Sequence, residues 1–264
     1  VKIYMDIVVC VKQVPDTTEV KIDPVTNTLI REGVPSIVNP FDKFALEIAL
    51  QLRDKHGGKV TVISMGPPQA SAALRECIAM GADEAILLSD RAFAGSDTLA
   101  TSYTLSQAVR KIAKYDLVIC GKQAIDGDTA QVGPEMAEHL GIGQLTYISA
   151  IEFDGEKVIA HREHDEGYDV IEAKPPLVVT IIKLPIDPRI PTVKGTAKAY
   201  RTEVPVWTAA DIAIDPKSAG LEGSPTLVKR IFTPERRGKG ELIQADAKEA
   251  VDLLVDKLRQ AKIL

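Results

Sequence analysis

The sequence predicts an α/β fold, a mostly parallel, doubly wound sheet of the Rossmann-like, adenine-nucleotide-binding type with added antiparallel strands and an extended C-terminal arm. Up to residue 145, short β-branched runs alternate with longer segments of helical periodicity, which is typical of a parallel sheet with helices on both faces. After residue 145, four strand-like runs follow one another without helices between them. Turn signals at residues 154–155 (DG) and 166–167 (EG) indicate that these runs form hairpins added to the sheet.

The first elements follow from local patterns. Residues 6–12 (DIVVCVK) form a short β-branched run that suits a strand buried on both faces. Residues 13–38 are predicted as a loop with a small hairpin at 20–30. Asn39 is then expected to cap a helix, because Pro40 suits the first helical position and apolar residues recur after it with helical spacing.

The remaining elements are assigned in the same way. The next strands are predicted at 59–65, 85–88 and 117–120, and the helices between and after them at 69–80, from 96–97 onward and at 131–140. The later strands are predicted at 147–153, 157–162, 168–172 and 177–183. Residues 184–205 hold four prolines and little periodicity, so they are predicted as a long structured loop, and such loops are usually functional. We therefore expect a nucleotide- or flavin-binding domain over 1–205 and an arm over 206–264 that ends in a helix at 241–264.

Composition argues against several classes of function. The chain of 264 residues has 32 Lys and Arg against 37 Asp and Glu, and a net charge of −5 argues against nucleic-acid binding. No apolar run approaches the ~20 residues of a membrane span and no signal-peptide pattern opens the chain, so a cytoplasmic protein is expected. Cys10, Cys77 and Cys120 are expected to be buried reduced thiols. His161 and His164 would point to opposite faces of a strand, so no metal site is predicted.

Two loops carry the clearest signal for a ligand. In an open α/β sheet, ligands bind outside the carboxyl ends of the strands. Residues 95–101 (GSDTLAT) and 121–133 (GKQAIDGDTAQVG) follow predicted strands and run into helix N-termini. Unpaired backbone N–H groups and the positive helix end suit phosphate there, and two such turns on one edge suit a nucleotide with two phosphates. Asp126 and Asp128 belong to the second of these loops and are near enough to the expected phosphates to hold ribose hydroxyls.

The familiar signatures of catalysis are missing. The sequence has no GxGxxG after its first strand, no GxxxxGK[ST] phosphate loop and no GxSxG nucleophile turn. No obvious acid, base, nucleophile or metal ligand set accompanies the two loops. A nucleotide-shaped site without such groups suits a carrier of a redox cofactor, in which the cofactor supplies the chemistry.

Six short segments stand out in order along the chain. They are residues 9–14 (VCVKQV), 39–42 (NPFD), 66–67 (GP), 79–83 (AMGAD), 121–126 (GKQAID) and 188–191 (PRIP). Together they resemble the β subunit of an electron-transfer flavoprotein, and the resemblance covers essentially the whole chain. It implies a heterodimer with a larger α subunit, which carries FAD in a mobile domain.

The resemblance implies one of two cofactors at the sheet edge. In simple members the β subunit binds AMP there. In electron-bifurcating members FAD takes that place and accepts a hydride from NADH. One electron then passes through the α-subunit flavin to an acyl-CoA-type or 2-hydroxy-acid dehydrogenase, and the other passes to ferredoxin or flavodoxin. Residues 94–101 and 127–135 resemble the bifurcating group. A simple β subunit and, from another class, a nucleotide-binding regulatory module are the alternatives.

The resemblance also assigns cofactor-binding residues. It implies that Cys10 and Met65 line the adenine, that Asn39 approaches the adenosine half, and that Ser96, Asp97, Thr98 and Thr101 meet the pyrophosphate. Gly66 is also assigned to the cofactor. The loop that wraps ribose and phosphate comprises Gly121, Lys122, Gln123, Ala124, Asp126, Gly127, Asp128, Thr129, Ala130, Gln131 and Val132. Because the carboxylate of Asp97 would repel phosphate, we expect it to cap its helix and to offer its backbone N–H.

Two further segments are expected to face partners. Residues 184–200 resemble the family's recognition loop for the acceptor dehydrogenase, with Arg189, Pro191 and Val193 as partner-binding residues. The C-terminal helix is apolar on one face, so it is expected to pack on the α subunit.

Overall fold

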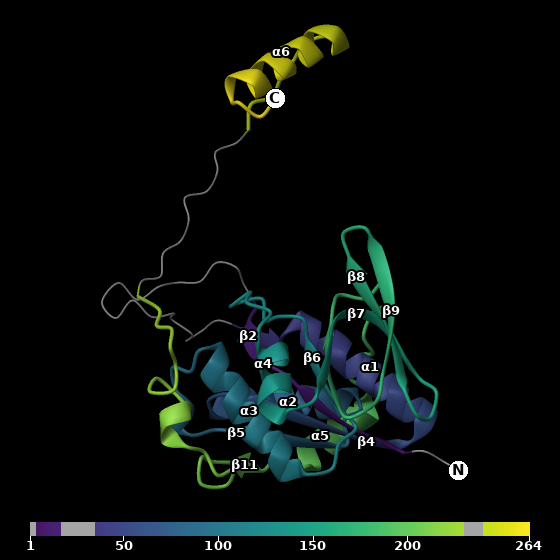
Figure 1. Ribbon diagram of the computed structural model, residues 1–264, viewed down its shortest axis with the longest axis vertical. Helices are drawn as coiled ribbons and strands as arrows, with labels where there is room; N and C mark the ends of the chain where they lie inside the picture. The colour runs from purple at the N-terminus through teal and green to yellow at the C-terminus, as the bar shows by residue number, and fades with distance from the viewer. Residues whose placement is uncertain (1–3, 17–34, 230–239) are drawn as a thin grey trace.

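The computed structural model describes residues 4–16, 35–229 and 240–264, so the hairpin predicted at 20–30 lies outside the described residues. In the described part, a nine-stranded sheet has the order β11–β5–β4–β1–β6–β10–β7–β8–β9 (Figure 1). Its strands are β1 (Met5–Cys10), β4 (Gly58–Met65), β5 (Glu84–Leu88), β6 (Leu117–Gly121), β7 (Gly143–Phe153), β8 (Val158–His164), β9 (Gly167–Ala173), β10 (Leu177–Ile181) and β11 (Val206–Trp207). All neighbours pair in parallel except β7 with β8 and β8 with β9. The predicted fold class is therefore confirmed.

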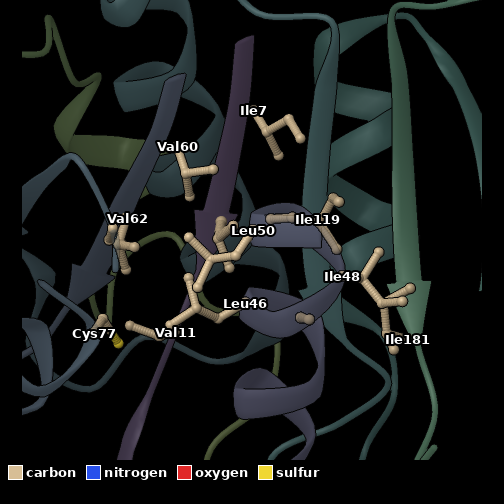
Figure 2. Close-up of a cluster of buried hydrophobic side chains, with 14 of the residues drawn as sticks. Ile7, Val11, Leu46, Ile48, Leu50, Val60, Val62, Cys77, Ile119 and Ile181 are labelled. Atoms are coloured by element: carbon tan, nitrogen blue, oxygen red, sulfur yellow. The ribbon is translucent and has the colours of Figure 1, made fainter. Parts of the chain in front are cut away.

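Helices cover both faces of the sheet. The helices α1 (Pro40–His56), α2 (Ser71–Met80) and α5 (Val193–Arg201) pack on one face, and α3 (Thr98–Ile112) and α4 (Val132–Leu140) pack on the other. Alternate residues of β1 point to opposite faces of the sheet. Ile7 packs in the first hydrophobic layer, under α1, α2 and α5, and Val8 packs in the second hydrophobic layer, under α3 and α4. Figure 2 shows Leu46 and Leu50 of α1 in the first layer. A strand apolar on both faces is what a doubly covered parallel sheet requires.

Short elements complete the described chain. The strands β2 (Gln13–Pro15) and β3 (Ser36–Val38) form a separate antiparallel pair. Single 3₁₀ turns occupy η1 (Pro68–Ala70), η2 (Arg91–Phe93) and η3 (Pro216–Ser218). The last helix, α6 (Ala247–Gln260), is shorter than the predicted 241–264, because the Asp246 side chain caps it by accepting from the Lys248 and Glu249 N–H groups. No residue of α6 is buried.

The crossovers reverse direction next to β1. The chain passes from β1 through α1 to β4 and through α2 to β5, and then returns through α3 to β6 on the other side of β1. The carboxyl ends of β1 and β6 therefore flank the point at which the strand order reverses. Ligands of open α/β sheets bind at such points.

Two predictions for the second half are wrong. The segment 177–181 is not part of a hairpin but forms β10, a central parallel strand between β6 and β7. All of its residues are buried, as a strand covered on both faces requires. Residues 193–201, inside the predicted loop, form α5, because Thr192 follows the last proline before it and caps the helix by accepting from the Gly195 N–H at 2.9 Å.

The chain beyond residue 205 stays on the sheet for some distance. The strand β11 pairs with β5, and Trp207, Ala209, Ile212 and Ile214 belong to the second hydrophobic layer. Within the described ranges, none of the helices has the length and apolar character needed to cross a membrane.

Candidate nucleotide site at the carboxyl edge of the sheet

Hydrogen bonds from Asn39, at the start of α1, hold the loop that follows β6. Asn39 is fully buried, donates from Nδ2 to the Gln123 carbonyl at 2.8 Å and accepts at Oδ1 from the Ile125 N–H at 3.1 Å. Its side chain makes no cap bond to α1, contrary to the prediction, and its carbonyl accepts from the Asp42 N–H instead. Asn39 therefore acts on this edge by holding the loop, and a direct contact with an adenosine stays a prediction.

Asp42 joins the ends of β1 and β6. Its Oδ2 accepts from the Lys12 N–H at 2.7 Å, and the Gly121 backbone also hydrogen-bonds to the carboxylate. Burial raises the pKa of Asp42 to about 7, although the hydrogen bonds act in the opposite direction. A Cβ at Gly121 would lie 2.3 Å from Asp42 Oδ1 and 2.7 Å from the Phe41 carbonyl carbon. The close approach of β6 to α1 therefore requires glycine.

The loop after β6 is held at its base and exposed at its tip. Lys12 Nζ pairs with Asp126 Oδ1 at 2.6 Å, and Gln123 Nε2 donates to Asp128 Oδ1. Asp128 and Ala130 have left-handed φ angles of 55° and 54°. Such backbone conformations are costly for residues with a Cβ and cluster at ligand-binding loops. Both aspartates accept hydrogen bonds within the protein, so their contacts to a ribose stay a prediction.

The N-termini of α3 and α4 meet on this edge. Thr98 Oγ1 lies 3.3 Å from Gln131 Oε1 and 3.1 Å from Glu135 Oε1. Gln131 precedes α4 and Glu135 lies in its first turn. In the part of the chain that the structure describes, the second oxygen of Glu135 is buried without a hydrogen-bond partner. Because buried acceptors are normally satisfied, this junction fits a ligand that donates a hydrogen bond to Glu135.

Asp97 caps α3, as predicted, and Oδ1 accepts from the Ala100 N–H at 3.1 Å. Its Oδ2 accepts from the Thr226 N–H at 3.0 Å and from the Thr226 hydroxyl at 2.8 Å. Burial alone would raise the pKa of Asp97. The hydrogen bonds from Thr226 and Ala100 lower it by more than burial raises it, so the pKa lies below its ordinary value. No local sequence pattern indicates this contact, because the two residues are 129 positions apart. Ser96 joins the same contact, since its Oγ accepts from the Gly220 N–H at 3.1 Å.

The strand ends beneath the loops are apolar. Cys10 is the register partner of Cys120, both are almost fully buried, and Cys10 Sγ lies 3.8 Å from Met136 Sδ. The hydrogen bond with Cys120 and burial hold the pKa of Cys10 well above its ordinary value, so this thiol is protonated and unreactive. Met65 ends β4, and the Gly66 N–H donates to the Leu88 carbonyl at 3.0 Å. This surface suits an adenine ring better than a charged group.

An open groove that the sequence analysis missed adjoins the loop after β6. It has a volume of about 650 Å³ and is lined by Phe41, Lys122, Tyr147, Glu163, His164, Asp165, Ile182 and Lys183. Lys122 Nζ lies 4.9 Å from the centre of the Tyr147 ring. The groove lies where β7 and β8 extend past α1, and this arrangement depends on pairings between distant strands that local patterns do not encode.

Arg189, which was predicted to bind a partner, is bound within the chain. Its Nε and Nη2 donate to the Glu47 carboxylate at 2.9 and 3.1 Å, its backbone N–H donates to the same carboxylate at 2.9 Å, and its Nη1 donates to Asp54 at 3.0 Å. The side chain of Glu47 is only 7% exposed. Val193, by contrast, is 91% exposed at the first turn of α5. The ion pairs thus fix the segment that presents Val193 to solvent.

Among the other predicted residues, the Ala124 carbonyl accepts from the Gly127 and Asp128 N–H groups at 3.3 and 2.8 Å. Thr101 lies one turn into α3 and is partly exposed, and Gly127 and Thr129 lie at the exposed tip of the loop. A Cβ at Gly127 would meet nothing within 4 Å. Within the described ranges, no group of three or more His, Cys, Asp and Glu side chains could hold a metal ion.

Comparison with known proteins shows the family of the chain. Residues 26–212 match the family model described as the electron transfer flavoprotein domain. The chain belongs to the electron transfer flavoprotein family. The matched residues include both loops of the candidate site and the segment around Arg189.

Relatives within this family align over nearly their whole length. The electron transfer flavoprotein subunit beta of Clostridium acetobutylicum is 57% identical over 97% of this chain and 98% of its own. The caffeyl-CoA reductase–Etf complex subunit CarD of Acetobacterium woodii is 52% identical over 98% of this chain and 100% of its own. Protein FixA of Azorhizobium caulinodans is 46% identical over 98% of this chain and 96% of its own. The resemblance to β subunits of the family is thereby confirmed, and an electron-transfer role follows.

Proposed function

We propose that the chain is the β subunit of an electron-bifurcating electron-transfer flavoprotein and that it binds FAD at the carboxyl edge of its sheet. The observation that carries this proposal is the meeting of the α3 and α4 N-termini at Thr98. A monophosphate such as AMP needs one helix N-terminus, whereas two converging N-termini suit the diphosphate of FAD. The buried, unpartnered oxygen of Glu135 beside them supports a ligand with hydroxyl groups near its diphosphate.

The residues of this edge have distinct roles in the proposal. The protonated thiol of Cys10 and the side chain of Met65 provide an apolar floor for adenine. The loop 121–131 wraps the ribose and one phosphate, with Asn39 holding its base. The α3 N-terminus receives the other phosphate, and Asp97 keeps its carboxylate on the protein side. When bound, FAD would accept a hydride from NADH and release the electrons singly to two acceptors.

The groove beside the loop suits the approach of NADH. The aromatic rings of Phe41 and Tyr147, the cations of Lys122 and Lys183, and the carboxylates of Glu163 and Asp165 line it. An aromatic wall favours the nicotinamide ring, and lysines favour its phosphates.

Two exposed apolar surfaces support the proposed partners. Val251 and Leu254 of α6 are 58% and 49% exposed, so α6 presents an apolar face that we assign to the α subunit. Val193 is the proposed anchor for the acceptor dehydrogenase, flanked by Pro191, and Arg189 supports it from within. The name of the Acetobacterium woodii relative favours an acyl-CoA-type partner. Ferredoxin or flavodoxin would take the second electron.

Replacing Thr98 by glutamate is expected to remove the FAD of this subunit and to leave that of the α subunit in place. The new carboxylate would stand at the α3 N-terminus, where phosphate is proposed to bind, and two like charges about 4 Å apart repel by about 4 kcal/mol at the effective dielectric constant that applies near a protein surface. The measurement is the FAD released from the purified heterodimer on denaturation. Thr202→Glu, which adds the same charge next to α5 on the other face, is the control and should retain both flavins. Full FAD content in Thr98→Glu would refute the site assignment.

A further inference from the structure

The tail turn, residues 218–226, packs directly on the start of α3. The Gly220 N–H donates to Ser96 Oγ at 3.1 Å, and the Asp97 N–H donates to Ser224 Oγ at 2.8 Å. Thr226 donates to Asp97 Oδ2 from both its N–H and its hydroxyl. Four hydrogen bonds therefore link this turn to two consecutive residues in front of α3.

Glycines allow this close approach. Gly220 has a left-handed φ of 59°, and a Cβ there would lie 2.3 Å from the Ala92 carbonyl oxygen. A Cβ on Gly95, whose φ is 76°, would lie 2.5 Å from Leu221 Cγ. The two backbones thus meet at Gly220, and the Leu221 side chain packs directly on Gly95. The tail turn and the start of α3 are therefore closely packed against each other.

The contact between the tail turn and α3 fixes the orientation of the Asp97 carboxylate. One carboxylate oxygen caps α3 through the Ala100 N–H, and the other is held by Thr226. With both oxygens occupied, Oδ1 stays on the Ala100 N–H and Oδ2 stays on the tail turn. Without the Thr226 hydroxyl, Oδ2 would keep only the bond from the Thr226 N–H and would turn more readily toward the α3 N-terminus, where it would compete with an anion for the same positive end.

We propose that Ser224 and Thr226 are positioning residues that hold the α3 start in a phosphate-accepting form and thereby favour FAD over AMP. The inference rests on the proposed nucleotide site. FAD needs both helix N-termini for its diphosphate, whereas AMP needs only the loop after β6. Loosening the α3 start should therefore weaken FAD and spare AMP, which a general loss of structure would not do.

The test compares Thr226→Val and Ser224→Ala with the matched control Thr208→Val in the heterodimer with its α subunit. Thr208 makes the same pair of bonds, from its N–H and its hydroxyl, to one carboxylate oxygen of Asp211, away from the α3 start. FAD and AMP are titrated separately into heterodimer whose β-subunit nucleotide has been removed. We expect the FAD dissociation constant to rise about five- to tenfold in the two variants, as for loss of one hydrogen bond that supports the α3 start. The AMP constant should change less than about twofold, and the control should match the wild type.

Hydrogen exchange of the amides at 97–100 supplies a readout independent of ligand, and it should be faster in both variants than in the control. Equal losses of FAD and AMP affinity would overturn the inference, because the turn would then be a general support. Unchanged affinities would overturn it as well. If Thr98→Glu also leaves FAD bound, the proposed site itself fails. If Thr98→Glu removes FAD while Thr226→Val leaves the FAD-to-AMP ratio unchanged, only the positioning role fails.

Discussion

Gly121→Ala is expected to lower the free energy of unfolding by about 1–3 kcal/mol, the usual cost of inserting a methyl group into closely packed structure. The added Cβ would lie 2.3 Å from Asp42 Oδ1 and 2.7 Å from the Phe41 carbonyl carbon. The second contact is with backbone, so the start of α1 must move away from β6. That movement would strain the bonds from Asn39 to Gln123 and Ile125, and nucleotide affinity should fall together with stability.

Thermal and denaturant unfolding measure this effect, and nucleotide titration measures its consequence. Gly127→Ala is the matched control, because it lies in the same loop and a Cβ there would meet nothing within 4 Å. Its stability should stay within about 0.5 kcal/mol of the wild type. An alanine at 121 that unfolds with the wild-type midpoint would show that the edge of the sheet is not packed as described.

The free energy of unfolding is expected to fall as pH rises from 5 to 7, and Asp42→Asn should remove this decline. Burial raises the pKa of Asp42 to about 7 in the folded protein, while in the unfolded chain the carboxyl has its ordinary value of 3.8. Between these values the folded state binds the extra proton, so stability is largest at low pH and is lost on titration toward pH 7. One such group contributes about 1.4 kcal/mol per pH unit.

The slope of stability against pH is the readout, since Asn also changes hydrogen bonds to Lys12 and Gly121 and so shifts the overall level. Asp90→Asn is the control. Hydrogen bonds from the Ala92 and Ala209 N–H groups hold the pKa of Asp90 below its ordinary value, so its stabilisation is already complete above pH 5. It should shift the curve without changing its slope. The same slope in Asp42→Asn and the wild type would contradict the account of Asp42.

Local pattern was sufficient for the sheet, because β1, β4, β5 and β6 are short apolar runs separated by periodic helices. Local pattern was not sufficient where the position of a strand in the sheet depends on which distant strands it pairs with. The pattern predicts a strand at 177–183, but the place of β10 between β6 and β7 is set by burial on both faces and not by its neighbours in sequence. In the loop predicted at 184–205, the density of prolines concealed the cap at Thr192 that begins α5.

The candidate site shows the same division. The cap at Asp97 follows from local chemistry. The tertiary partners do not, because Asn39 bonds to Gln123 84 positions away, Asp97 bonds to Thr226 129 positions away, and glycine at 121 is required by its contact with Phe41 and Asp42. Side-chain amides, carboxylates and hydroxyls pair with many groups, so sequence alone indicates that such residues matter without indicating what they hold. The groove beside Lys122 was missed for the same reason.

The central claim is that this subunit carries a flavin that NADH reduces. The most direct measurement is the identity of the nucleotide bound to the β subunit, by denaturing the purified heterodimer and separating the released FAD and AMP, followed by anaerobic titration with NADH. The account predicts FAD in both subunits, no AMP, and bleaching of flavin absorbance by NADH. AMP in the β subunit, with FAD in the α subunit alone and no reduction by NADH, would contradict it.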